Sequence, residues 1–525
     1  MSAGAAAPVL AFADARTCKE WLNALPLTNI PQAQSMVLES VRALEAAPFD
    51  ALERLKSLEL MREKIAFLQG EQRSRYFGKS LPLAAADAAA WTTGASLLAA
   101  MEQGYRTCLE RGGAELAAHR PLMMQRAARY IGAQMLFHAT VYRRFDPALW
   151  TRLHALYRDA EAGGLATEAV KDSVDAPEGP SSVAETYAHI ILMQASYLSE
   201  MTAQQMEFAE GLLRLWARKV PIVNAAPDTA YPLAVDWSKP IGARPLAAQG
   251  ERGDVRVLDV EGLSRSMRKR IHALQAEEDP AAMGLPQIPG VDPASQLQRL
   301  HRLWCEGAPP RPPARPSEVK TVALVLGIAD IHFFVSGGKV FEQPDKKREL
   351  TRQEKQDLEV FGRVTERTSS RMVAEHNFLV EPWPVVDEMR GAWRVERPRN
   401  AAKSVAIGRL VAMRMGDAGS FFLGMVSALS QETDGRLIAT VTLFPGRPEP
   451  VPVRAADARN RSNAKWSEGF RLPALEKANI AASLVVPSGM GARGRGVELW
   501  NDGPKETTVY EVLERGTDFE RITVF

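Results

Sequence analysis

The chain has 525 residues, which is more than one hydrophobic core usually serves, so we expect two to four domains. Hydrophobic residues make up 46% and charged residues 24%, as in an ordinary folded globular protein. The 65 basic and 63 acidic residues leave a net charge of +2, which argues against a general nucleic-acid binder, because that class needs a basic surplus to neutralise phosphates.

The cysteines are far apart, at Cys18, Cys108 and Cys305, and no CxxC spacing occurs. The sequence therefore predicts neither a zinc site nor a disulfide framework, and idle thiols in a reducing compartment are the expected state. The histidines form no HExxH or HxxxH pair, so we expect no metal site.

The apolar stretch near the start of the chain lacks a basic region before it, and Pro8 and Asp14 interrupt or close it. We expect no secretory signal here. No apolar run approaches the ~20 residues that span a bilayer. The sequence predicts no transmembrane segment and a cytoplasmic location.

Residues 1–220 are predicted to form an all-α helical bundle or array. Some segments are apolar on two faces, as in Ile190-Ile191-Leu192-Met193, so their helices need neighbours on more than one side. The last helix follows a polar loop, where Ser181 or Ser182 is the expected N-cap and Glu185 completes a capping box with Ser182. The predicted helices cover residues 33–47, 49–69, 83–111, 115–142, 147–163 and 183–219.

Residues 221–306 are predicted to be a mixed α/β middle segment. It contains strand-like stretches at 231–236 and 255–259 and helices at 263–278 and 296–306. The first of these helices is basic and amphipathic, which indicates a solvated helix face or, alternatively, contact with a membrane or an acidic partner. Residues 307–317 are rich in proline and are predicted to be an extended, semi-rigid linker.

Residues 318–371 are predicted to hold a short strand at 320–326, a helix at 328–335 and a charged, helix-prone lead-in. Residues 372–525 are rich in strand patterns with Gly and Pro at short intervals, which predicts a small antiparallel β-barrel with a C-terminal β extension. The expected fold class is therefore multidomain α+β.

The order of motifs in this last region is informative. Arg363, Arg367 and Arg371 precede a predicted strand at 372–380, and a predicted turn around residues 387–391 follows it. Further strands are predicted at 392–396, 409–414, 421–429 and 437–444, the last two joined by a hairpin turn at Asp434-Gly435.

This order resembles the PilZ domain, the bacterial receptor barrel for cyclic di-GMP. Arg367-Thr-Ser-Ser-Arg371 matches the RxxxR motif of that family, Gly424-Met-Val426 matches its GxV strand, and Thr440-Val-Thr-Leu-Phe444 matches its closing strand. The resemblance covers about residues 363–446, under a fifth of the chain. It implies a cyclic di-GMP ligand held by the residues that match the motifs: Arg363, Arg367, Arg371, Asp387 and Gly391.

The chemistry of these residues suits a dinucleotide with two phosphates. Arginine offers a planar fork to phosphate oxygens and stacks on guanine, and two arginines four apart can face one ligand. The resemblance implies that Asp387 accepts hydrogen bonds from a guanine edge and that Gly391 permits a close turn.

The second motif of the family, (D/N)xSxxG, is only approximately matched. Met389 stands where the family has Ser, and Gly391 comes one residue early. Losing one neutral contact and displacing the loop would cost ~1–4 kcal/mol, or roughly 5-fold to 1000-fold in affinity.

Two alternatives therefore stay open. Arginine and glutamate alternate at pairing distances in residues 343–371, as in a salt-bridged helix face that binds no ligand. The protein would then be a protein–protein scaffold whose barrel binds no nucleotide. We find no general acid–base set, phosphate loop or nucleophile elbow, and we expect no enzyme and no cofactor.

We therefore expect a bacterial cyclic di-GMP effector or adaptor without catalytic activity. Its C-terminal barrel would sense the ligand, and the helical N-terminal half would contact a protein partner. Nucleic acid is not an expected partner.

Overall fold

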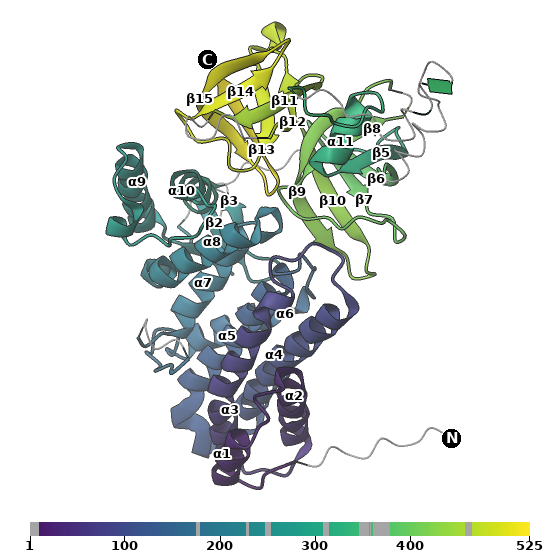
Figure 1. Ribbon diagram of the computed structural model, residues 1–525. Helices are drawn as coiled ribbons and strands as arrows, with labels where there is room; N and C mark the ends of the chain where they lie inside the picture. Colours follow the sequence, from purple (N-terminus) through teal and green to yellow (C-terminus); the bar gives the residue numbers. More distant parts are fainter. Residues whose placement is uncertain are drawn as a thin grey trace. The chain divides into compact units, whose positions relative to one another are not determined.

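The computed structural model of the chain (Figure 1) describes residues 10–174, 179–226, 230–246, 254–307, 314–345, 356, 359–360, 378–416, 418–456 and 465–525. The chain divides into two compact units, Met1–Pro310 and Arg311–Phe525. The point of division falls within the proline-rich segment 307–317. Each unit is described by itself.

The first unit begins with a helical region that confirms the predicted all-α fold of this part. Helix starts carry the expected polar caps: the Asp50 side chain accepts hydrogen bonds from the backbone N–H groups of Leu52 and Glu53, which have no partner within the helix. The described helices are α1 (Ala15–Asn23), α2 (Ile30–Ala46), α3 (Ala51–Gln72), α4 (Ala85–Arg111), α5 (Arg120–Ala139), α6 (Ala148–Ala162), α7 (Val183–Ala195) and α8 (Ala203–Trp216).

The prediction of one helix over residues 183–219 is wrong. The structure places two helices there, α7 and α8, with Tyr197 between them in the left-handed backbone region (φ 53°). Thr202 starts α8 with its own capping box to Gln205. The predicted capping box of Ser182 and Glu185 at the start of α7 is confirmed.

The mixed segment after residue 220 forms a small antiparallel sheet in the order β1 (Ile222–Asn224), β4 (Val255–Leu258), β2 (Tyr231–Asp236) and β3 (Arg244–Leu246). Helices α9 (Glu261–Gln275) and α10 (Pro293–His301) follow it, and η7 (Arg302–Gly307) continues α10 as a π-helix.

The mixed segment and the helical region share one hydrophobic core, which draws buried side chains from α5 to α8, from the sheet and from α9 and α10. Trp304 of η7 is fully buried, and its Nε1 donates hydrogen bonds to Leu192 O (3.1 Å) and Ser196 Oγ (3.0 Å) at the end of α7. The mixed segment therefore packs against its neighbour, while the predicted domain boundary at residue 220 stays a prediction.

The described strands of the second unit confirm a closed antiparallel β-barrel and add a second one. The first barrel has the order β10 (Leu437–Leu443), β7 (Ala392–Glu396), β6 (Glu381–Met389), β5 (Thr321–Leu326), β8 (Leu410–Met415) and β9 (Phe422–Gln431). The second has the order β11 (Glu449–Ala455), β12 (Ser467–Leu472), β13 (Ser483–Pro487), β16 (Phe519–Val524), β15 (Pro504–Arg515) and β14 (Gly496–Trp500).

Three details of the sequence prediction change here. The strand at 320–326, expected in the lead-in, closes the first barrel as β5 by pairing with β6 and β8. The strand expected at 372–380 lies mostly outside the described residues, and β6 begins only at Glu381. What was expected as a C-terminal β extension is the second closed barrel.

The two barrels are joined through a common core that includes Phe444, Phe470 and Phe519. Helix α11 (Ile328–Val335), predicted at 328–335, adds Ile331 to the same core. At the junction, the Asp518 carboxylate accepts a hydrogen bond from the backbone N–H of Leu410 (2.9 Å). The second unit is therefore a double barrel rather than a barrel with a loose tail.

Candidate functional site

Two of the five predicted ligand-binding residues lie within the described part of the first barrel. Arg363, Arg367 and Arg371 lie outside the described residues. Asp387 is in β6, and Gly391 is in the turn between β6 and β7.

Asp387 faces Arg394 across the β6–β7 hairpin, where the two residues are register partners. Arg394 Nη1 donates to Asp387 Oδ2 at 2.6 Å, and the two side chains are 27% and 14% exposed. The other carboxylate oxygen, Oδ1, is buried and accepts no hydrogen bond from a described residue. One oxygen of Asp387 is thus held by an arginine, and the second has capacity to accept a donor.

The predicted turn around residues 387–391 is shorter than expected, because β6 continues through Met389. Gly391 has a φ of 77°, the left-handed region where a glycine carries no Cβ penalty, and this explains a glycine at the hairpin tip. Met389 is half-buried at the end of β6, where the family pattern has a serine hydroxyl.

The tryptophans that flank this hairpin differ in burial. Trp383 is fully buried, and its Nε1 donates to Glu381 Oε2 at 3.1 Å, so it belongs to the barrel core. Trp393 of β7 is half-buried and lies opposite Glu388 in the register. Trp383 is therefore unsuitable for stacking on a base.

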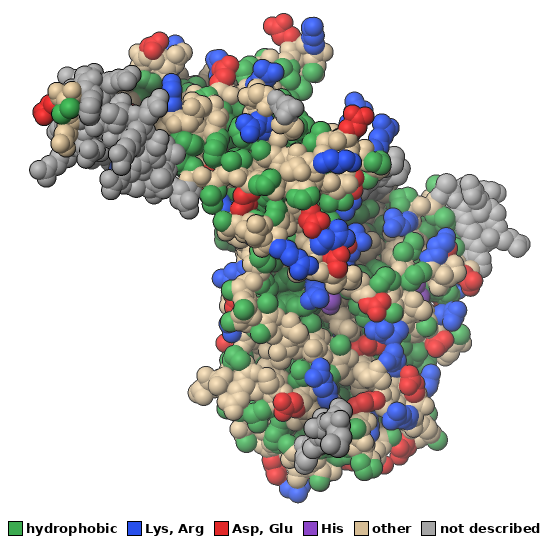
Figure 2. All heavy atoms as spheres, turned by 90° about the vertical axis from the view of Figure 1, so that its right-hand side faces the viewer, with side chains coloured by type: hydrophobic (Ala, Val, Ile, Leu, Met, Phe, Trp, Pro, Cys, Tyr) green, Lys and Arg blue, Asp and Glu red, His purple; other side chains and the backbone are tan. Residues whose placement is uncertain are grey.

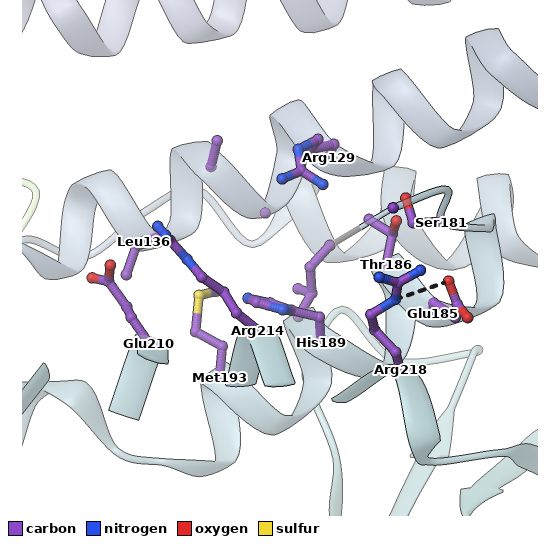
Figure 3. Close-up of a pocket in the computed structure, with 14 residues that line it drawn as sticks. Arg129, Leu136, Ser181, Glu185, Thr186, His189, Met193, Glu210, Arg214 and Arg218 are labelled. Atoms are coloured by element: carbon purple, nitrogen blue, oxygen red, sulfur yellow. Dashed lines mark ion pairs between the residues drawn. The ribbon is translucent and has the colours of Figure 1, made fainter. Parts of the chain in front are cut away.

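A second candidate site lies in the first unit, in a cavity of about 170 Å³ between α5, α7 and α8. Figure 3 shows Arg129 reaching into it from α5, His189 and Met193 from α7, and Arg214 from α8. Arg218 of η5 (Ala217–Lys219) completes the set of guanidinium groups that line the cavity in the described part of the chain.

The arginines of this cavity differ in how they are engaged. Arg218 lies 3.6 Å from Glu185, the contact dashed in Figure 3, and also donates to Pro180 O. Arg129 lies 3.7 Å from the buried Asp172. Arg214 is exposed and forms no hydrogen bond or ion pair with any other described residue. The guanidinium group of Arg214 is therefore a positive charge without a fixed partner on the exposed side of the cavity.

His189 lies between these arginines, and its ring forms no hydrogen bond with a described residue. Burial, together with the charges of Arg129 and Arg214, lowers the pKa of His189 to about 4. The ring is therefore neutral at physiological pH, with one donor and one acceptor nitrogen.

The acidic groups of the cavity are Glu185 and Glu210. Glu210 lies 3.5 Å from Arg73, and burial raises its pKa against the lowering effects of Arg73 and Arg214. Glu185 is paired with Arg218 and Glu210 with Arg73, while Arg214 interacts with Glu210 through charge alone.

The sequence analysis missed this cavity. Two spacings of four residues were visible, Glu185-His189-Met193 and Glu210-Arg214-Arg218. Such spacing places side chains on one helix face. These two faces meet only because α8 is a separate helix that packs against α7. The prediction of one continuous helix over residues 183–219 excluded this packing.

The described residues hold no group of three or more His, Cys, Asp and Glu side chains arranged for a metal ion. All three cysteines are free, and burial raises the pKa of Cys18 and Cys305 to about 12 and that of Cys108 to about 11. These thiols are therefore protonated at neutral pH and are poor nucleophiles.

No helix within the described ranges is both long and apolar enough to cross a bilayer. On the face of the molecule shown in Figure 2, basic and acidic side chains are interspersed, as the near-zero net charge leads one to expect. The described side chains of that face thus form no broad basic surface of the kind that nucleic-acid binders use.

Comparison with known proteins places the chain near cyclic di-GMP receptors. Residues 16–227 match the family described as "Cyclic-di-GMP receptor FimW, N-terminal domain". This segment contains helices α2 to α8 and every residue that lines the cavity. The resemblance to cyclic di-GMP receptor proteins that the sequence suggested is thereby confirmed, in a part of the chain outside the barrel motifs.

A curated relative is the protein named "Cyclic-di-GMP receptor FimW" from Pseudomonas aeruginosa, which is 23% identical over 341 residues. The alignment covers 64% of this chain, and it spans only 56% of the length of the relative. No solved structure matches the chain.

Proposed function

We propose that this protein is a non-catalytic bacterial effector that binds cyclic di-GMP at its first barrel and passes the signal to a partner through its helical unit. The similarity to a protein named as a cyclic di-GMP receptor, in residues 16–227 and over 64% of the chain, carries the proposal. A cytoplasmic location, where the free cysteines stay reduced, goes with this role.

The first barrel suits the proposed site because β6 and β7 present an aspartate with one oxygen free of described donors. Asp387 Oδ1 would accept a hydrogen bond from a guanine N–H, while the contact with Arg394 orients the carboxylate. Arg363, Arg367 and Arg371 are the proposed phosphate contacts, because each guanidinium offers two parallel donors to a phosphate.

Titration of the purified full-length chain with cyclic di-GMP by isothermal calorimetry tests the proposal. We expect saturable heat from the wild type and a loss of roughly 10-fold or more in affinity for Arg367→Ala plus Arg371→Ala, because each charge-assisted contact is worth ~1.5–3 kcal/mol. The matched control is Arg447→Ala plus Arg493→Ala, which removes two exposed arginines of the second unit that lie outside the proposed site. This control should bind like the wild type.

Absence of heat from the wild type would sink the receptor role and favour a scaffold whose barrel binds no nucleotide. Two observations would fit that outcome: Arg394 already occupies one oxygen of Asp387, and Met389 replaces a polar side chain of the family pattern. Equal affinity in the double variant and its control would reject the barrel arginines as the site.

A further inference from the structure

The cavity between α5, α7 and α8 combines features that nothing in the barrel proposal uses. Its polar side is lined by guanidinium groups, the His189 ring and the hydroxyls of Ser181 and Thr186. Its apolar side is lined by Leu136, Ile190 and Met193. In Figure 3 the side chain of Arg214 extends toward Leu136 and that of Arg218 lies near Glu185, with His189 between them.

Two of the polar groups have no partner in the described part of the chain. Arg214 and the ring of His189 face the cavity without a hydrogen bond or ion pair to any described residue. Arg214 lies one helical turn before Arg218, and the two side chains diverge on either side of His189. Arg129 contributes a further positive group but is already engaged near Asp172.

The size and chemistry of the cavity limit what it can hold. A volume of about 170 Å³ is far above the ~10–15 Å³ that one water molecule needs, so it has room for an anionic group with a small organic body. A guanidinium group favours multiply charged oxyanions such as phosphate, because its paired N–H donors match two oxygens of the anion. The neutral imidazole of His189 adds one hydrogen-bond donor and one acceptor to the cavity.

We propose that this cavity binds the phosphate group of a small organic phosphate, with Arg214 on the phosphate oxygens and the apolar side against the organic part. His189 donates one hydrogen bond to the same group. The site belongs to the helical unit and is independent of the barrel, so the two proposals stand or fall separately.

The test is calorimetric titration of the full-length chain with guanosine monophosphate and with inorganic phosphate, at constant ionic strength so that general screening does not change. We expect guanosine monophosphate to bind the wild type. Arg214→Met should weaken binding roughly 10- to 100-fold, the range for one charge-assisted contact. Arg214 is exposed and unpaired among the described residues, so this variant should fold normally.

Two further variants distinguish binding in the cavity from non-specific attraction of the anion to the charge of the protein surface. Ala133→Phe adds bulk to the half-buried cavity lining without changing charge, and it should weaken binding as Arg214→Met does. Arg158→Met removes an exposed arginine of α6 outside the cavity and should leave binding unchanged. Equal losses in Arg158→Met and Arg214→Met would overturn the proposal.

A parallel titration with cyclic di-GMP distinguishes the two sites. If Arg214→Met loses the dinucleotide while Arg367→Ala plus Arg371→Ala keeps it, the cavity proposal is supported and the barrel proposal fails. If guanosine monophosphate, inorganic phosphate and cyclic di-GMP all fail to show binding that depends on Arg214, the cavity proposal is wrong whatever the barrel does.

Discussion

Asp387 and Arg394 are register partners on the antiparallel strands β6 and β7, and Arg394 Nη1 lies 2.6 Å from Asp387 Oδ2. A cross-strand pair of opposite charge stabilises a sheet, and partial burial strengthens it. The pair therefore has a structural role in the first barrel even without a ligand.

A double-mutant cycle measures this role. We expect Asp387→Asn and Arg394→Gln to show a coupling energy of about 1–2 kcal/mol in urea unfolding, since the contact is charge-assisted and partly buried. Arg436 and Asp434, an exposed pair at the β9–β10 turn, are the matched control and should couple by ~0.2–1 kcal/mol. A coupling for Asp387 and Arg394 no larger than that of the control would contradict the structure.

A second prediction concerns the buried charges around Asp172, which lies in the connection between α6 and α7. Asp172 is 1% exposed and contacts Arg62 (2.6 Å) and Arg126 (3.0 Å), which are 3% and 2% exposed. Burial alone would raise the pKa of Asp172, but Arg62 and Arg126 outweigh it and hold the pKa below its ordinary value. Asp172→Asn should destabilise the chain by about 3–5 kcal/mol, because it leaves two buried arginines with Glu59 as their remaining shared anion.

The pH dependence gives this prediction its sign. An aspartate with a depressed folded pKa stabilises the fold above the unfolded pKa, and the stabilisation is lost as the pH falls through the folded value. The difference in the free energy of unfolding between the wild type and Asp172→Asn should therefore be largest near neutral pH and become smaller below about pH 4. Asp159→Asn, an exposed change on α6, should cause no comparable loss at any pH.

These cases show which features could be predicted from sequence. The start of α7 followed from local chemistry, because the Ser182–Glu185 capping box involves residues three apart. The break before α8 had a similar local signal in Thr202 and Gln205, but the apolar pattern continues across it, and the break itself needs Tyr197 in a left-handed conformation. The left-handed conformation of Tyr197 depends on tertiary packing, which apolar periodicity in the sequence does not predict.

The closure of the first barrel and the helical cavity could not be predicted from local sequence patterns, because both depend on contacts between residues far apart in the sequence. β5 pairs with β8, and Val322 meets Met415 across a sequence separation that no alternation pattern specifies. Likewise, Arg129 and Arg214 come from helices far apart in the sequence. Asp387 could be singled out from a motif, whereas its pairing with Arg394 depends on the register of the β6–β7 hairpin.

A third prediction tests how the mixed segment is attached to the helical region. Trp304 is fully buried and donates to Leu192 O and Ser196 Oγ. Trp304→Ala should destabilise the chain by about 3–5 kcal/mol through lost packing and a cavity. Trp304→Phe keeps most of the packing but removes the donor, and should cost ~1–3 kcal/mol for the acceptors left buried. Equal costs for the two variants would show that packing does not dominate at this site.

The last prediction concerns His189 in the helical cavity. Its pKa is lowered to about 4, against an ordinary value of 6.5, so between these values the unfolded chain binds a proton that the folded chain does not. Stability should therefore fall as the pH is lowered from about 6.5 to 4, with His189 contributing about 1–3 kcal/mol of the loss. Burial and neighbouring Arg129 and Arg214 disfavour the charged ring.

His189→Gln isolates this contribution. The ring has no hydrogen bond to a described residue, so glutamine should cost little at neutral pH while it flattens the decline in stability below pH 6.5. The acidic groups that face the same cavity, Glu185 and Glu210, stay in place in both proteins, so their titration largely cancels in the difference. His119→Gln changes an exposed position outside the cavity, and its stability should fall with decreasing pH as that of the wild type does. If His189→Gln and His119→Gln show the same decline, the imidazole of His189 is not held neutral by its surroundings, and it would then add a positive charge rather than a neutral donor to the cavity in mild acid.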